Sequence, residues 1–195
     1  MSIHVITGPM RSGKTLDLIE SVRRSRANRI KTLVFTHKLA ARVHGKRLMS
    51  RTGAVLRATP VGSAEDIIQA AKDAKPGSVI VIDEAHFFNL DDAERIVSLL
   101  ARRFGLLVAG LDTDFRGESF PSIAYLIAAA DSVTRLTATC ARCGAPATRT
   151  QRLIDGKPAP WDSPVILPGG DDMYEPRCVD CHEVPGRPGV SEACC

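Results

Sequence analysis

The chain has 195 residues, and its content of 44% hydrophobic and 25% charged residues is ordinary for a soluble globular protein. This length allows one domain and a small appendage. No apolar run reaches the about 20 residues needed to span a bilayer, and no signal peptide is recognisable, so we expect a cytoplasmic protein that does not enter a membrane. The net charge of +4 suits an anionic small ligand as well as nucleic acid.

Strand and helix signals alternate along the first two-thirds of the chain. A short β-branched run over residues 3–7 ends at a glycine, and apolar side chains at helical spacing follow over residues 14–26. By the same criteria we expect further strands over residues 32–36, 78–83, 106–111 and 132–138, and helices over residues 63–74, 91–103 and 120–130. The alternation predicts an α/β fold: a P-loop (RecA-like), doubly wound and mostly parallel sheet.

The pattern changes near residue 139. Residues 144–177 are rich in proline and glycine, and Asp155-Gly156 is typical of a hairpin turn. We therefore expect a nucleotide-binding domain over residues 1–138, a small domain over residues 139–185 and a flexible tail over residues 186–195. The basic segment 37–53 shows no clear period, and its structure is not predicted.

A phosphate-binding loop begins seven residues after the first. The motif G-x-x-x-x-G-K-[ST] lies between the first strand and the first helix, which is the context it requires. Its glycines let backbone N–H groups turn inward around an anion, Lys14 reaches the β- and γ-phosphates, and the Thr15 hydroxyl ligates Mg²⁺. The residues expected to bind ATP here are Gly8, Pro9, Met10, Arg11, Ser12, Gly13, Lys14 and Thr15.

An acidic pair, Asp83-Glu84, ends the buried strand 78–83 and is followed by Ala85 and His86. Asp83 is placed to hold Mg²⁺ beside Thr15 through water, and Glu84 to accept a proton from a nucleophile. The segment 83–86 is therefore expected to border the ATP site. Taken alone, such a pair is also typical of a helix cap. The same letters spell DEAH, the signature of one helicase class, although 195 residues do not hold the two cores that a helicase motor needs.

Two cysteine pairs, each with C-x-x-C spacing, are separated by 34 residues. In a reducing compartment this arrangement favours a structural zinc site with four thiolates over a disulfide. The ligands would be Cys140, Cys143, Cys178 and Cys181. His182 could replace Cys181 as the fourth ligand. The alternatives to a zinc site are free thiols without a metal, or a disulfide.

Taken together, several segments resemble the thymidine kinase family of the zinc-containing cytosolic type (type II): GPMRSGKT, VIVIDEAHFF, GLDTDFRGESF, LTATCARC, TQRLIDGKP and VILPGGDDMYEPRCVDCH. The resemblance covers most of residues 1–185. It implies a P-loop domain that binds ATP, and a small zinc domain whose lasso loop closes over thymidine. The implied reaction moves the ATP γ-phosphate to the 5′-hydroxyl of thymidine and gives dTMP, a salvage step for DNA synthesis. A homotetramer without a nucleic-acid partner is also implied.

The resemblance assigns roles to individual residues. Glu84 matches the catalytic base, and Phe115 matches the aromatic side chain that stacks on thymine. Pocket residues are matched by Met10, Leu111, Phe120 and Tyr174, and the lasso backbone that binds the base edge by Val165, Ile166, Leu167, Pro168 and Gly169. Arg152 matches an arginine near the phosphates. Without the resemblance, Phe115 and Phe120 would be read as core residues.

The chain departs from the family at three places. His86 stands where glutamine or a similar polar residue is usual, and Arg11 stands where phenylalanine or tyrosine is more usual in the phosphate-binding loop. Segment 37–53 lacks the acidic, tyrosine-containing pattern. Two other functions therefore remain as alternatives. The DEAH letters and the basic run over residues 23–31 suggest a nucleic-acid-stimulated ATPase. The second alternative is a regulator that contains structural zinc and binds a nucleotide but catalyses no reaction.

Overall fold

A computed structural model describes residues 1–166 and 173–189, and of residues 43 and 44 the backbone only. Its centre is a sheet of six strands, all paired in parallel, in the order β5-β2-β6-β7-β1-β8. These strands are β1 (Ile3–Thr7), β2 (Thr32–His37), β5 (Thr59–Val61), β6 (Val79–Asp83), β7 (Gly105–Gly110) and β8 (Ser132–Arg135). The predicted parallel α/β sheet is confirmed.

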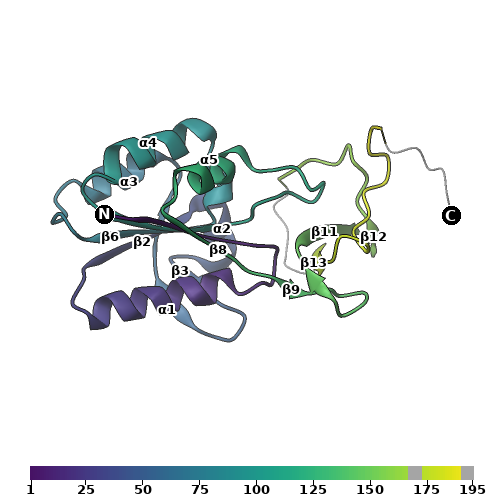
Figure 1. The fold of residues 1–195 in the computed structure, drawn as a ribbon, viewed down its shortest axis with the longest axis horizontal. Coiled ribbons are helices and arrows are strands. Elements are labelled where there is room, and N and C mark those ends of the chain that lie inside the picture. Colours follow the sequence, from purple (N-terminus) through teal and green to yellow (C-terminus); the bar gives the residue numbers. More distant parts are fainter. Residues whose placement is uncertain (167–172, 190–195) are drawn as a thin grey trace.

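Helices cover both faces of this sheet (Figure 1). One face packs against α3 (Ala64–Ala71), α4 (Leu90–Leu100) and α5 (Pro121–Ala129), and the other against α1 (Lys14–Ala27). Successive strand residues alternate between the two resulting cores: Ile80 and Ile82 face the first, whereas Val81 faces the second. This alternation explains why strand β6 is apolar throughout, because neither of its faces meets water.

The helix ends follow local capping chemistry. The Ser63 hydroxyl accepts a hydrogen bond from the backbone N–H of Asp66, and the Asp66 carboxylate accepts one from Gly62 at 2.7 Å, two residues before the helix begins. Helix α4 starts after Asn89, whose side chain accepts from the N–H of Asp92. Both α3 and α4 end three residues before their predicted limits, since a turn closes each helix there.

The segment that begins at residue 37, whose structure was not predicted from the sequence, forms a short helix and a hairpin. Helix α2 (Lys38–His44) begins at His37, whose ring nitrogen accepts from the N–H of Leu39. Strands β3 (Arg47–Met49) and β4 (Val55–Arg57) pair antiparallel, and Leu48 is buried in the core under α1. These elements are too short to show a hydrophobic period, which explains why the sequence did not indicate them.

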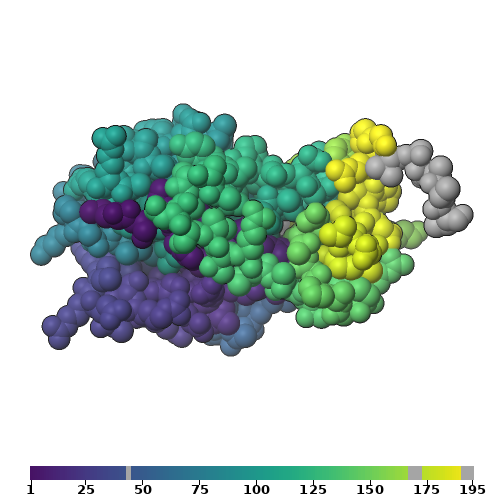
Figure 2. Space-filling view, viewed as in Figure 1, coloured from purple at the N-terminus to yellow at the C-terminus, as the bar shows by residue number. Residues whose placement is uncertain are grey.

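A C-terminal lobe, defined here as residues 138–166 and 173–189, occupies one end of the molecule (Figure 2). It contains β9 (Ala138–Thr139), β10 (Pro146–Ala147), β11 (Arg149–Ile154), β12 (Lys157–Pro158) and β13 (Tyr174–Arg177), all paired antiparallel. The turn at Asp155-Gly156 is confirmed: both residues have positive φ angles, of 50° and 75°, as a primed hairpin turn requires. The predicted strand 132–138 is divided, because β8 ends at Arg135 and β9 belongs to the lobe.

The start of the predicted tail is packed against the lobe. The Trp161 N–H donates to the Pro185 carbonyl at 2.8 Å, and the Arg187 guanidinium lies 5.5 Å from the centre of the Trp161 ring. Residues 190–195 of that prediction lie outside the described residues. The predicted domain limits themselves remain a proposal.

Candidate active site

The phosphate-binding loop joins β1 to α1 through a sharply turned backbone. Gly8 has a φ of 145°, and a Cβ there would lie 2.3 Å from the Leu136 carbonyl oxygen, so glycine is required. Gly13, with a φ of 92°, leads into α1. The Lys14 ammonium folds back over the loop and donates to the carbonyls of Gly8 and Pro9 at 2.9 and 2.6 Å. Burial lowers the pKa of Lys14, while the charges of Glu84, Asp83 and Asp112 oppose this effect.

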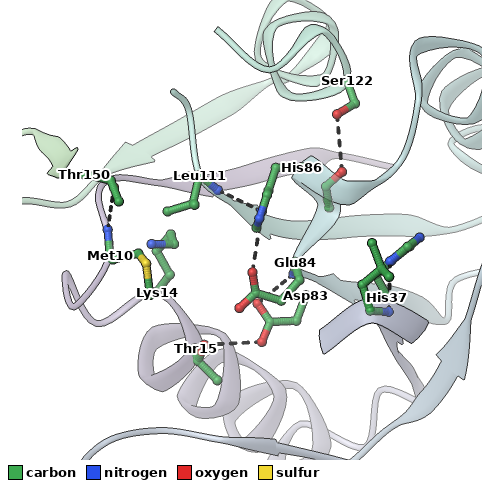
Figure 3. A network of polar contacts seen from close by, with 12 residues as sticks. Met10, Lys14, Thr15, His37, Asp83, Glu84, His86, Leu111, Ser122 and Thr150 are labelled. Carbon is green, nitrogen blue, oxygen red and sulfur yellow. Dashed lines mark hydrogen bonds and ion pairs between the residues drawn. The ribbon is translucent and has the colours of Figure 1, made fainter. Parts of the chain in front are cut away.

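Asp83 and Thr15 meet at the edge of the sheet where β6 ends. The Thr15 hydroxyl donates to the Asp83 carboxylate at 3.3 Å (Figure 3). Burial, followed by the charge of Glu84, raises the pKa of Asp83 to about 7. A divalent cation between the two side chains would favour the ionised carboxylate instead. A hydroxyl and a carboxylate oxygen are hard ligands, so the donor set fits Mg²⁺.

Glu84 follows directly, but the backbone reverses its direction. Its φ of 57° is unusual for a residue with a side chain and is typical of functional sites. The Glu84 N–H donates to the Asp83 carboxylate at 3.0 Å, which closes the turn. The two acidic side chains therefore separate: Asp83 is buried against Thr15, whereas the Glu84 side chain is 32% exposed and lines the cavity described below.

His86 is a buried, neutral imidazole beside Glu84. Burial, followed by the charge of Lys14, lowers the pKa of His86 to about 3. Its Nδ1 accepts a hydrogen bond from the Leu111 N–H at 3.3 Å, which leaves the ring proton on Nε2. The Glu84 carboxylate lies 3.5 Å from the same Nδ1, but a neutral ring with an acceptor there forms no salt bridge. His86 thus borders the Glu84 carboxylate without neutralising its charge.

A cavity of about 550 Å³ connects these groups to the C-terminal lobe. Of the residues predicted for the site, it is lined by Met10, Arg11, Ser12, Gly13, Lys14, Thr15, Asp83, Glu84, His86, Leu111, Phe120, Val165, Ile166 and Tyr174. Gly8, Pro9 and Ala85 do not line it: the carbonyls of Gly8 and Pro9 accept from the Lys14 ammonium, and the Ala85 carbonyl accepts from the Ser122 hydroxyl. Leu167, Pro168 and Gly169 lie outside the described residues.

Sequence reasoning missed several lining residues. Helix α2 and the β3–β4 hairpin contribute Leu39, Ala40, Arg42, Arg47, Leu48, Met49, Ser50, Arg51 and Thr52, and other segments contribute Thr36, Phe87, Thr113, Asp114 and Thr150. The hairpin residues had no periodic signal. Thr150 is brought in by a long-range contact: its hydroxyl accepts from the Met10 N–H at 3.0 Å and joins the lobe to the phosphate-binding loop (Figure 3).

Phe115 lies behind the cavity wall. It is 2% exposed and does not line the cavity, because the Arg152 guanidinium covers its ring at 4.3 Å. The stacking role of Phe115 stays a prediction. Arg152, matched in the sequence to the phosphate region, lines the cavity and donates to the Tyr174 hydroxyl and to the carbonyls of Pro164 and Val165.

The four predicted cysteines come together in the lobe, where all their sulfur atoms lie within 4.8 Å of one another. Tetrahedral zinc with bonds of about 2.3 Å needs sulfur separations of about 3.8 Å, and the Cys143–Cys178 separation is 3.6 Å. Burial would raise the pKa of Cys140, but hydrogen bonds from the backbones of Cys178, Cys143 and Arg142 outweigh it and lower the pKa to about 6. The thiols therefore form a site that could hold a metal ion. His182 is engaged elsewhere, 2.9 Å from the Phe115 carbonyl.

Replacing one thiol should release the metal. We expect Cys143→Ser to lower the zinc content of the purified protein from about one ion per chain to well below that value, because three thiolates hold zinc less tightly than four. Atomic absorption measures the content, and Cys194→Ser, outside the four, is the control. Equal zinc in both variants would refute ligation by four thiolates.

The buried His86 should make stability depend on pH. Folded His86 stays neutral to about pH 3, whereas the unfolded imidazole binds a proton near 6.5, so acid favours the unfolded chain. Between about pH 7 and pH 5, the free energy of unfolding should therefore fall more steeply for the wild type than for His86→Gln. Urea unfolding at several pH values measures both curves, and parallel curves would contradict a neutral His86.

Comparison with known proteins agrees with the resemblance read from the sequence. Residues 1–182 match the family model described as thymidine kinase. Two curated relatives named thymidine kinase, from the J-10-fl and Y-400-fl strains of Chloroflexus aurantiacus, are each 45% identical over 93% of this chain and 94% of their own length.

A solved structure of the genome packaging NTPase B204 from Sulfolobus turreted icosahedral virus 2, in complex with sulfate, is 18% identical over 73% of this chain and 76% of its own, with a TM-score of 0.45. Within residues 1–166 and 173–189, no helix is long and apolar enough to cross a bilayer. On the extent of the family match and the identity to these relatives, the chain belongs to the thymidine kinase family.

Proposed function

We propose that this protein transfers the γ-phosphate of ATP to the 5′-hydroxyl of thymidine, giving dTMP and ADP. The observation that carries the proposal is a single cavity. The phosphate-binding loop, the acidic pair and the lobe residues matched to nucleoside binding all line it. A donor phosphate and an acceptor nucleoside can therefore meet in one enclosed space, which a phosphotransferase needs and a nucleotide-binding regulator does not.

The chemistry follows from the positions of the charged groups. Glu84 accepts the proton of the 5′-hydroxyl as that oxygen attacks the γ-phosphorus, and the bond to the ADP oxygen breaks. Lys14 and the N–H groups of the loop balance the charge on the phosphate oxygens. Thr15 and Asp83 would hold Mg²⁺, which when bound neutralises charge on the β- and γ-phosphates.

The nucleoside would lie toward the lobe. Leu111, Phe120 and Met10 supply apolar walls, and Tyr174 and residues 165–166 approach from the lobe side. Backbone groups of the lasso, of which 167–169 lie outside the described residues, would bind the base edge, as the family resemblance implies. Closure of the lobe over the phosphates would also exclude water and limit ATP hydrolysis.

Zinc would act structurally. Four thiolates fill a tetrahedral shell and leave no open position for substrate. The metal would join the β9–β10 hairpin to the segment after β13, and so close the loop that contains β11 and residues 159–173. The cytoplasmic location and the homotetramer implied by the resemblance stay predictions.

The nucleic-acid-stimulated ATPase is not favoured. Its main support was the DEAH spelling at residues 83–86, and these residues lie within the family match that covers residues 1–182. Both acidic residues also have roles in the kinase site.

Removing the base tests the proposal. In Glu84→Gln we expect kcat for dTMP formation to fall by about 10²- to 10⁴-fold, the usual contribution of a general base, with little change in the KM for ATP. Radiolabelled thymidine with Mg-ATP measures the product. Glu20→Gln, on an exposed position of α1, is the matched control. Full activity in Glu84→Gln would remove Glu84 from this role.

A further inference from the structure

A buried cation lies in the C-terminal lobe, at the wall of the cavity. Arg152, on β11, is only 1% exposed, although a charged side chain is costly to bury without partners. Among residues 1–166 and 173–189, no carboxylate forms an ion pair with it. The described groups around its charge are neutral.

Neutral oxygens and aromatic rings contact the guanidinium. Arg152 Nε and Nη2 donate to the Tyr174 hydroxyl at 2.9 and 2.6 Å, Nη1 donates to the Pro164 carbonyl, and Nη2 also donates to the Val165 carbonyl. The guanidinium lies 4.3 Å from the centre of the Phe115 ring and 5.0 Å from that of Tyr174. Each guanidinium nitrogen thus has an acceptor, and two rings contact the charge.

This arrangement does not suit an arginine that binds phosphate. A phosphate ligand would need donors directed at its oxygens, but four of the five N–H groups of this guanidinium are directed at protein oxygens. The acceptors instead belong to groups matched to nucleoside binding: Val165 begins the lasso segment, and both Val165 and Tyr174 line the cavity.

We propose that Arg152 is a positioning residue for the nucleoside, and not a ligand of the ATP phosphates. It fixes the direction of the Pro164 and Val165 carbonyls and of the Tyr174 hydroxyl. Val165 and Tyr174, which line the cavity, are therefore held in place before a nucleoside binds. The identity of that nucleoside rests on the proposed function.

Arginine is specifically required for this role. Its planar fork can donate to acceptors on three sides while its faces lie against Phe115 and Tyr174. A lysine at this position keeps the charge but has one nitrogen, so it cannot satisfy the same acceptors. Arg152→Lys therefore separates the geometry of the side chain from its charge.

The test measures two dissociation constants for each variant. Thymidine binding is followed by the fluorescence of Trp161, the one tryptophan in the sequence, which stands four residues before Val165, and Mg-ADP binding is followed by calorimetry. In Arg152→Lys we expect the Kd for thymidine to rise by about 30-fold, because a hydrogen bond to a charged group is lost. The Kd for Mg-ADP should change by less than about threefold. Arg149→Lys, on the same strand, should change neither constant.

A second variant covers the case in which Arg152→Lys does not fold, as judged by zinc content and thermal unfolding. Tyr174→Phe keeps the ring and removes the hydroxyl acceptor. It should raise the Kd for thymidine alone, and by less than the 30-fold above. Combined with Arg152→Lys, it should add little, because both changes break the same contact.

Equal losses of thymidine and Mg-ADP affinity in Arg152→Lys would indicate a phosphate role and overturn the proposal, as would unchanged thymidine binding. If only Tyr174→Phe folds, unchanged thymidine binding in that variant overturns it too. If the wild type binds a different nucleoside and not thymidine, the proposed function fails. The same comparison with that nucleoside then still decides the role of Arg152.

Discussion

The site depends on one contact between distant parts of the chain. The Met10 N–H, in the phosphate-binding loop, donates to the Thr150 hydroxyl at 3.0 Å, across 140 residues of sequence. Thr150 and Arg152 lie on the same face of strand β11, since alternate residues of a strand point to one side. Strand β11 therefore meets the phosphate-binding loop through one side chain and the lasso segment through the other. Two further contacts support the same placement of the lobe: the Arg116 guanidinium donates to the Ser163 carbonyl, and His182 lies 2.9 Å from the Phe115 carbonyl.

Burial gives the polar groups of the site their chemical character. Lys14, Asp83, His86 and Arg152 are all nearly inaccessible to water. Each is stabilised by specific partners: carbonyls for Lys14, the Thr15 hydroxyl for Asp83, a backbone N–H for His86, and oxygens with aromatic rings for Arg152. Low dielectric strengthens these interactions and penalises the loss of any partner. The same environment would strengthen the attraction between a bound phosphate and the loop.

Much of the fold could be predicted because its signals are local. Strands such as β6 are buried on both faces and so read as apolar runs, and the glycines at 8 and 13 mark a backbone that other residues cannot adopt. The four-cysteine cluster could also be predicted, from the C-x-x-C spacing of its two pairs. The α2 and β3–β4 segment was not predicted, since its elements are too short to show a hydrophobic period. Thr150 was missed because its contact with Met10 arises only when the lobe packs on the sheet. The position of Phe115 behind Arg152 follows from that packing and not from its neighbours in sequence.

The central claim is that the phosphate-binding loop and the lobe enclose one continuous site. A compound that joins the 5′-oxygens of adenosine and thymidine through a phosphate chain tests it most directly, with calorimetry as the measurement. The account predicts one molecule bound per chain, with a Kd far below those of ATP and thymidine, since both ends bind at once. Binding no tighter than that of ATP, with thymidine still able to bind beside the compound, would show two separate sites and contradict the account.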